Sequence, residues 1–310
     1  MTEHIPPYVV SITPFTEGGE IDEPALREHL RRLGDAGVGV YLAGGGSGEG
    51  FALTLPETVR IFEIGAEELK GRVPVMSMGH EPHTATQLHN VIAAAESVGL
   101  DGAQVYSLDG GHVFRPNPAE LSAYYEDVLD GISLPLVVST HPSVGYFLPP
   151  ELLERLFAER DVVGVNVTNP DITYLVDLID MLADRGWLGS PIAVHVGGEM
   201  QGLTNLALGG HGIVSSMGNL TPRLLARMHT RFHEGDVAGS AEDFATLLRI
   251  YDEFTKLGGS KALKVALNML GLPGGYPRRP RLPIDESLHP RVRELIDRFG
   301  IEEMELGGGG

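Results

Sequence analysis

Residues 38–57 read VGVYLAGGGSGEGFALTLPE and contain one complete strand-to-helix unit. Val38 to Leu42 is a run of apolar and β-branched residues that predicts a buried strand, and a glycine-rich loop follows it. Thr54 and Glu57 then have the spacing of a capping box, with Pro56 inside the first helical turn. The stretch therefore predicts a strand, a loop at the carboxyl end of that strand, and a helix.

The same alternation of short strand and helix continues on both sides of this stretch, up to about residue 234. Strands are expected at 8–13, 38–42, 73–78, 102–106, 134–139, 162–167, 191–196 and 212–215. Eight such units in about 225 residues fit a (β/α)8 TIM barrel, whereas an open doubly wound sheet has roughly five or six strands. The sequence predicts an α/β barrel over residues 1–235.

The rest of the chain has helical periodicity and no strand signal. Phe244, Leu247 and Tyr251 recur at helical spacing, and a second apolar stretch follows from Leu263 to Leu270. We expect a C-terminal helical domain over residues 236–300. The last segment, 301–310, ends in four glycines and is expected to be a flexible tail.

Composition excludes several classes of protein. The chain has 42 Asp plus Glu against 23 Lys plus Arg, a formal net charge of −19, and no Cys. Negative charge opposes binding to nucleic-acid backbones, and the lack of Cys excludes disulfides, thiolate metal sites and a Cys nucleophile. Residues 1–7 lack the pattern of a signal peptide, and no stretch approaches 18 uninterrupted apolar residues. We expect a cytoplasmic protein that binds neither nucleic acid nor membrane.

The active site of a TIM barrel lies at the carboxyl ends of its strands, so the loops there hold the candidate residues. The loop after the second strand contains Gly46, Ser47 and Gly48. Its backbone amides and its hydroxyl could bind an anion such as a carboxylate. Alternatively, the glycines serve only a tight turn that needs positive φ angles.

Four segments, spread over nearly the whole chain, carry a resemblance to a known family. They are Thr13–Phe15 with Ile21–Asp22, Gly45–Glu49 with Leu53–Thr54, Gly209–Ser215 through Asn219 and Pro222, and Lys264–Asn268 through Gly271–Pro273. Their order and spacing resemble the dihydrodipicolinate synthase and N-acetylneuraminate lyase family of barrel aldolases. The resemblance implies a barrel with a C-terminal helical domain, a homo-oligomer that is usually a tetramer, and action on 2-oxo acids.

The sequence departs from that family at two positions where the resemblance implies catalytic residues. The family's Schiff-base lysine falls on Asn166, and its proton-transferring tyrosine falls on Ser139. An iminium needs a primary amine, and no predicted strand contains one of the four lysines, Lys70, Lys256, Lys261 and Lys264. We therefore expect a mechanism without a lysine Schiff base. Asn166 and Ser139 would instead orient a substrate carbonyl.

Histidines occur at or near several predicted strand ends. His112 follows the fourth strand, His141 ends the fifth, and His195 lies on the seventh. They could act as general acid or base in place of the tyrosine, bind a divalent ion that polarises a keto group, or only form hydrogen bonds with loops and solvent. We favour proton transfer, and expect neither a metal nor another cofactor.

These observations predict a lyase, whether aldolase, dehydratase or cyclising enzyme, for a carboxylated 2-oxo compound. The predicted catalytic residues are His141, His112, His195, Ser139 and Asn166, and the predicted substrate-binding residues are Gly46, Ser47, Gly48, Asp109, Thr168 and Glu199. The alternative is a non-catalytic ligand-binding or regulatory paralogue. Polar replacements at the barrel mouth favour the enzyme, because drift would as readily introduce apolar residues.

Overall fold

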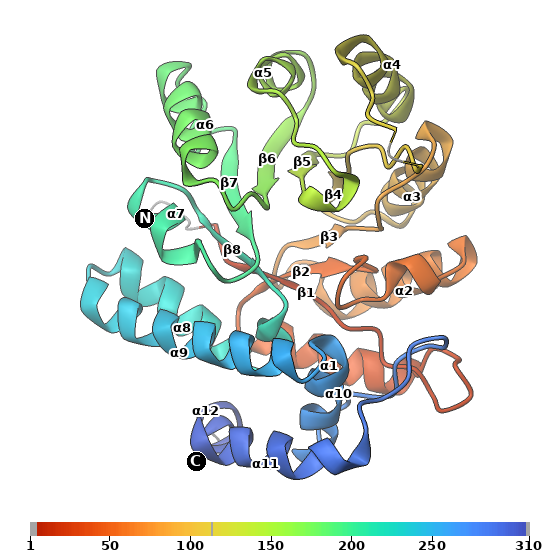
Figure 1. Cartoon of the computed structure of the whole chain (residues 1–310). Coiled ribbons are helices and arrows are strands. Elements are labelled where there is room, and N and C mark those ends of the chain that lie inside the picture. Colours follow the sequence, from red (N-terminus) through yellow and green to blue (C-terminus); the bar gives the residue numbers. More distant parts are fainter. Residues whose placement is uncertain (1–4, 113, 308–310) are drawn as a thin grey trace.

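The computed structural model describes residues 5–112 and 114–307 and forms a closed barrel of parallel strands (Figure 1). The strands are β1 (Tyr8–Val10), β2 (Gly39–Leu42), β3 (Val75–Ser77), β4 (Gly102–Val105), β5 (Leu136–Thr140), β6 (Val162–Val167), β7 (Ala193–Gly197) and β8 (Gly212–Ser215). Each strand pairs with the next one in the chain, and β8 pairs with β1. The predicted (β/α)8 TIM barrel is confirmed.

Helices surround the barrel and pack their apolar faces against it (Figure 1). They are α1 (Glu23–Asp35), α2 (Leu55–Leu69), α3 (Ala85–Val98), α4 (Pro118–Leu129), α5 (Pro150–Glu159), α6 (Ile172–Asp184), α7 (Gly202–Ala207) and α8 (Pro222–His233). Capping decides where two of them begin. Thr54 and Thr84 each accept a hydrogen bond from a backbone N–H of the first turn, and Glu57 and Gln87 bond back to the two caps.

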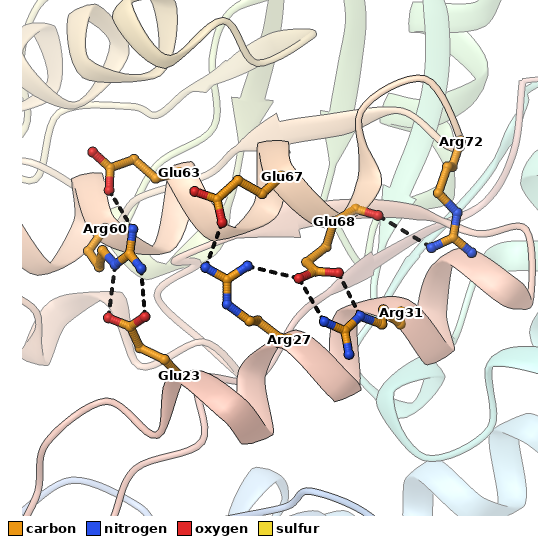
Figure 2. A network of polar contacts seen from close by, with 8 residues as sticks. All are labelled: Glu23, Arg27, Arg31, Arg60, Glu63, Glu67, Glu68 and Arg72. Atoms are coloured by element: carbon orange, nitrogen blue, oxygen red, sulfur yellow. Dashed lines mark hydrogen bonds and ion pairs between the residues drawn. The ribbon is translucent and has the colours of Figure 1, made fainter.

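Figure 2 shows an ion-pair network that connects α1 with α2. Arg60 contacts Glu23 at 2.6 Å, and Glu68 accepts hydrogen bonds from Arg27 and Arg31 at 2.8 and 2.6 Å. Exposed pairs of this kind contribute about 0–1 kcal/mol each and weaken in salt. The network therefore stabilises the contact between the two helices modestly, and the buried apolar residues of both helices contribute the larger part.

The C-terminal part consists of α9 (Val237–Lys256), α10 (Ser260–Met269), α11 (His289–Arg298) and α12 (Ile301–Leu306), and α9 packs along α8 (Figure 1). Short 3-10 turns lie at Gly50–Ala52, Pro142–Val144, Met217–Asn219 and Glu286–Leu288. None of the helices in the described part of the chain combines the length and the apolar character that a membrane span requires.

The expectation of a flexible tail from residue 301 is wrong for its first part. Residues 301–306 form α12, in which Ile301 is fully buried. Glu305 is buried as well, and its carboxylate accepts hydrogen bonds from the N–H groups of Arg223 and Leu224. These N–H groups belong to the first turn of α8, where an acidic group is favourable. Residues 308–310 lie outside the described residues.

Candidate active site

A cavity of about 460 Å³ lies at the carboxyl ends of the strands. Seven predicted site residues line it, namely Gly46, Ser47, Ser139, His141, Asn166, Thr168 and Glu199. Residues that the sequence analysis did not single out line it as well, among them Glu81, Gln104, Tyr106 and Tyr251. The cavity therefore brings polar side chains from β4, β5 and β6 together with the loops after β2, β3 and β7 and with α9.

The glycine-rich loop after β2 offers unpaired donors to this cavity. The N–H groups of Gly46, Ser47 and Gly48 donate to no acceptor among the described residues, nor does the hydroxyl of Ser47, whose side chain is buried. A cluster of free amides beside a hydroxyl is suited to a carboxylate. The loop can therefore bind an anion that arrives in the cavity.

The alternative explanation of these glycines, a need for positive φ angles, does not hold for this loop. The positive φ angles lie at Ala43 and Glu49, which flank the glycines. Gly48 is required by close approach instead, since a Cβ there would lie 2.7 Å from the backbone nitrogen of Gly44. At Gly46 a Cβ would meet no atom within 4 Å, so the missing side chain leaves open space in the cavity.

Two amide side chains lie deep in the cavity and pair with each other. Nδ2 of Asn166 donates to Oε1 of Gln104 at 2.9 Å, while Oδ1 of Asn166 and Nε2 of Gln104 are buried without a partner among the described residues. If both amides were turned over, a donor and an acceptor would still remain free. The pair therefore presents one N–H donor group and one acceptor to a ligand.

Glu199 is fully buried and still lines the cavity. Its Oε1 accepts hydrogen bonds from Oγ of Ser215 at 2.7 Å and from the N–H groups of Ser216 and Met217 at 3.1 and 3.0 Å. Its Oε2 has no partner among the described residues. Burial raises the pKa of the Glu199 carboxyl above its ordinary value, although these hydrogen bonds oppose the shift. Oε2 is free to bond to a hydroxyl of a ligand.

His141 is connected to a carboxylate through a serine. The hydroxyl of Ser143 donates to Oε1 of Glu81 at 2.5 Å, and its oxygen lies 2.7 Å from Nδ1 of His141. Because the only hydroxyl proton points at Glu81, the serine oxygen can only accept from His141, which favours the proton on Nδ1. The backbone N–H of Ser143 donates to the same Nδ1 at 3.1 Å and favours the opposite tautomer, so the two contacts of Nδ1 compete. When the proton is on Nδ1, Nε2 carries the lone pair and can act as a base.

Two opposing effects set the acidity of His141. Partial burial lowers the pKa of its imidazole below the ordinary value of 6.5, and the charge of Glu81 opposes this shift. His141 is therefore neutral near pH 7 and available as a proton acceptor.

Four predicted site residues do not belong to the cavity lining among the described residues. His195 is buried beside Tyr8, its Nε2 lies 3.2 Å from the carbonyl oxygen of Pro6 before β1, and burial lowers its pKa to about 3. His112 is exposed with a φ of 42°. Asp109 lies 3.8 Å from the ring of His83, and Gly48 accepts a hydrogen bond from Thr13 through its carbonyl. His112, His195 and Asp109 therefore have no contact with a ligand in this cavity, and Gly48 can offer only its free backbone N–H.

A signal for two of the unforeseen lining residues is visible in the sequence. Gln104 is a polar residue inside the predicted strand 102–106, and Glu81 follows the third strand between His80 and His83. Tyr251 has no such signal, since it fits the apolar period of a helix. Burial, together with the charge of Glu199, raises its pKa.

The described residues contain no group of three or more His, Asp or Glu side chains that could hold a metal ion. The interpretation of the histidines as metal ligands therefore finds no ligand set in residues 5–112 and 114–307.

A family model described as the dihydrodipicolinate synthetase family matches residues 7–299. The chain belongs to this family. It is 29% identical over 295 residues to 4-hydroxy-tetrahydrodipicolinate synthase from Corynebacterium aurimucosum. The match covers 94% of this chain and 94% of the relative. The protein of the same name from Methanospirillum hungatei is 27% identical over 291 residues, 93% of this chain and 97% of the relative.

Solved structures of dihydrodipicolinate synthase family members share the fold. YagE, a prophage protein of this family from E. coli K12 solved in complex with pyruvate, is 25% identical and has a TM-score of 0.85. The match covers 96% of this chain and 99% of YagE. The predicted membership of the family is therefore confirmed, and so is the barrel with its C-terminal helical part.

Proposed function

We propose that this member of the dihydrodipicolinate synthetase family is a lyase of the aldolase type for a carboxylated 2-oxo compound, and that it works without a lysine Schiff base. The observation that carries the proposal is the buried pair of Asn166 and Gln104. Asn166 occupies the position where the family resemblance implies a lysine. The described lining of the cavity contains no lysine. The names of the curated relatives, which are synthases, and the pyruvate bound to YagE support an enzyme for 2-oxo acids.

The substrate is oriented by neutral donors. Its carboxylate binds to the free amides and the hydroxyl of the loop at Ser47. Its keto oxygen then accepts a hydrogen bond from Nε2 of Gln104, which has no other partner among the described residues. A preorganised donor in a buried site stabilises negative charge that develops on such an oxygen, as an oxyanion hole does. This hydrogen bond takes over the electron-withdrawing role of an iminium.

His141 moves the proton. Its Nε2 takes the proton of a hydroxyl on the second carbon from the keto group. The bond between this hydroxyl-bearing carbon and the carbon next to the keto group then breaks. The products are an aldehyde and the enolate of a 2-oxo acid. The protonated His141 returns the proton to the enolate carbon, so the proton count is unchanged. Ser143 and Glu81 stabilise the imidazolium that forms between the two steps.

A dehydration would use a different enolate, formed when a base removes the α-proton of the intact hydroxy acid before its hydroxyl leaves as water, so the substrate screen should contain both reaction types. Oε2 of Glu199 and Oδ1 of Asn166 are the unpaired acceptors that line the cavity, and each can bind a substrate hydroxyl. Ser139 on β5 pairs in register with Asn166 on β6, and His141 follows two positions later in the chain. The hydroxyl of Ser139 contributes a further contact to the carbonyl region.

Borohydride trapping with pyruvate, read by intact mass, tests the mechanism. We expect no covalent adduct on the wild-type chain, because none of the described residues that line the cavity carries an amine. Asn166→Lys, with the amine introduced at the position implied by the family, is the matched positive variant. An adduct on any wild-type lysine would contradict the proposal, and Lys261 is the first to inspect because it lines an adjoining cavity.

Turnover separates the lyase from the non-catalytic paralogue. We would screen hydroxylated 2-oxo acids with the wild type, His141→Gln, and His83→Gln as a control at an exposed histidine outside the cavity. The proposal expects turnover that His141→Gln lowers by about 10²–10⁴-fold and His83→Gln does not. Binding without turnover of any compound would favour the paralogue.

We also propose that the protein is a cytoplasmic homo-oligomer, a dimer or tetramer, as the family resemblance implies. Light scattering on the purified chain checks the oligomeric state, and cell fractionation checks the location. A monomer at working concentration would contradict the proposed oligomer.

A further inference from the structure

A second cavity, of about 430 Å³, adjoins the first one. Gly46, Ser47, Ser216 and Tyr251 line both cavities, so the glycine-rich loop and Tyr251 stand between them. The rest of its lining comes from the 3-10 turn after β8, the junction of α9 and α10, and the segment that contains Arg281. A ligand in one cavity is therefore directly next to the other.

The two cavities differ in charge. The first is lined by the carboxylates Glu81 and Glu199, whereas the second is lined by the cations Lys261 and Arg281. Among the described residues that line the second cavity, none is Asp or Glu. Two cations without a facing carboxylate make this cavity attractive to anions.

Neither cation has a carboxylate partner in the part of the chain that the structure describes. Lys261 and Arg281 make no ion pair and no side-chain hydrogen bond with another described residue, although Arg281 lies over the ring of Phe51 at 4.4 Å. Arg278, from the same segment, shows the contrast, because its guanidinium bonds to Glu57 and to backbone carbonyls. In a chain with 42 acidic and 23 basic residues, two cations that line one cavity without a carboxylate partner among the described residues point to a ligand rather than to stability.

Neutral donors and bare backbone complete the second cavity. Ser47, whose hydroxyl is assigned to the carboxylate in the first cavity, borders both cavities, and Ser260 begins α10, whose amino end has no side-chain cap. Gly259 adopts a φ of 60°, and a Cβ there would meet no atom within 4 Å. The space at Gly259, which lines the same cavity of about 430 Å³ as Lys261, is therefore not filled by a side chain.

We propose that the second cavity binds an acidic group, carboxylate or phosphate, of the compound whose 2-oxo acid end occupies the first cavity. This inference rests on the proposed function and names its substrate class, a compound with two acidic groups. One acidic group lies at the amides of the 45–48 loop, and the other lies between Lys261 and Arg281. A charge-assisted contact with each cation provides the affinity.

Equilibrium binding tests the inference independently of turnover. Isothermal titration at constant ionic strength would use inorganic phosphate, succinate and pyruvate as probes. The variants are Lys261→Met, which keeps the apolar stem, Lys261→Arg, which keeps the charge, and Lys256→Met, which removes an equal charge from an exposed lysine on α9. Thermal unfolding would confirm that each variant is folded.

We expect Lys261→Met to weaken binding of phosphate or succinate by about tenfold, and Lys261→Arg to retain it. The affinity for pyruvate, whose single carboxylate binds at the loop, should change less than about twofold in this variant. The more strongly affected probe identifies the acidic group as phosphate or carboxylate. Lys256→Met should match the wild type with all three probes.

Three results would overturn the inference. The first is that wild type binds neither phosphate nor succinate, and the second is that Lys261→Met and Lys256→Met behave alike. The third is an equal loss for pyruvate and for the dianions, which would assign the cations to the same carboxylate as the loop. In each case the pyruvate titration and the turnover screen still decide the proposed function separately.

Discussion

Nδ2 of Asn166 donates a 2.9 Å hydrogen bond to Oε1 of Gln104, which joins β6 to β4 past the intervening strand β5. Both side chains are almost completely buried, at 3% and 1% exposure. Each amide fixes the orientation of the other, and each is left with one unpaired atom. The cavity therefore contains a polar pair in which Nε2 of Gln104 and Oδ1 of Asn166 have no hydrogen-bond partner among the described residues.

Removal of one member of this pair should affect both stability and activity. Gln104→Leu leaves Nδ2 of Asn166 buried without an acceptor, so we expect a loss of about 1–3 kcal/mol in the free energy of unfolding. The loss of the donor to the keto oxygen should lower kcat by about 10²–10³-fold. Urea denaturation and the turnover assay measure the two effects.

The double variant Gln104→Leu with Asn166→Leu is the control for this prediction. It removes both polar groups, so part of the stability should return while activity stays low. A single variant as stable and as active as the wild type would show that the pair is neither structural nor functional.

Glu199 predicts a specific dependence of stability on pH. Burial raises its pKa above 4.5, so between 4.5 and the folded-state pKa the folded chain binds a proton that the unfolded chain releases. The free energy of unfolding should therefore fall as the pH rises through this window. Glu199→Gln keeps the acceptor for Ser215 and lacks the titration, so the variant should gain stability relative to the wild type across the window.

Urea denaturation of both proteins from pH 4 to pH 8 measures this difference directly, with steps of about half a unit. A difference that is independent of pH would show that Glu199 titrates alike in the folded and unfolded chains. In the turnover assay we expect Glu199→Gln to raise KM, since Oε2 is the free acceptor for a substrate hydroxyl.

Much of the fold was predictable because its signals are local. The helix starts at Thr54 and Thr84 depend on residues three positions apart, and each strand carries its own apolar run. Residues 301–306 were mispredicted for the opposite reason. Their helix is stabilised by the burial of Ile301 and by the contact of Glu305 with α8, which lies about 80 positions earlier in the chain.

The site was predictable only in part, because sequence shows which face a residue takes in a strand and not its depth in the barrel. Asn166 and His195 are neighbours in register across β6 and β7, yet Asn166 lines the cavity while His195 bonds toward Pro6. Tyr251 and Lys261 reach the site from α9 and α10. Only the packing of the C-terminal helices against the barrel places them there.

Glu81 should set the acidity of His141, because its Oε1 lies 3.6 Å from Nδ1 of the imidazole. The charge of Glu81 raises the pKa of His141 against the effect of burial, so Glu81→Gln should lower that pKa further below 6.5. The acidic limb of kcat/KM should shift to lower pH by the same amount, because the base form persists to lower pH. NMR titration of the His141 ring measures the pKa.

Asp109→Asn is the matched control, since this carboxylate lies near His83 rather than His141. It should leave the His141 titration unchanged. A higher pKa in Glu81→Gln, or equal shifts in both variants, would contradict the assigned effect of the Glu81 charge on His141.

Lys264 should be essential for the attachment of the C-terminal helices to the barrel. Its Nζ donates to Oε1 of Glu49 at 2.6 Å and to the carbonyl oxygens of Thr13 and Tyr276 at 2.8 Å each, and both charged side chains are buried. Lys264→Met leaves the Glu49 carboxylate buried without its cation, so we expect a loss of about 3–5 kcal/mol in the free energy of unfolding. Lys256→Met, which breaks an exposed pair, should lose at most about 0.5 kcal/mol.

Adding Glu49→Gln to Lys264→Met removes the unpaired charge, and part of the lost stability should return. Urea denaturation of the four proteins provides all the values. If Lys264→Met were no less stable than Lys256→Met, the buried pair would not hold the two parts together. If the double variant were less stable than Lys264→Met, the unpaired carboxylate would not be the cause of the loss.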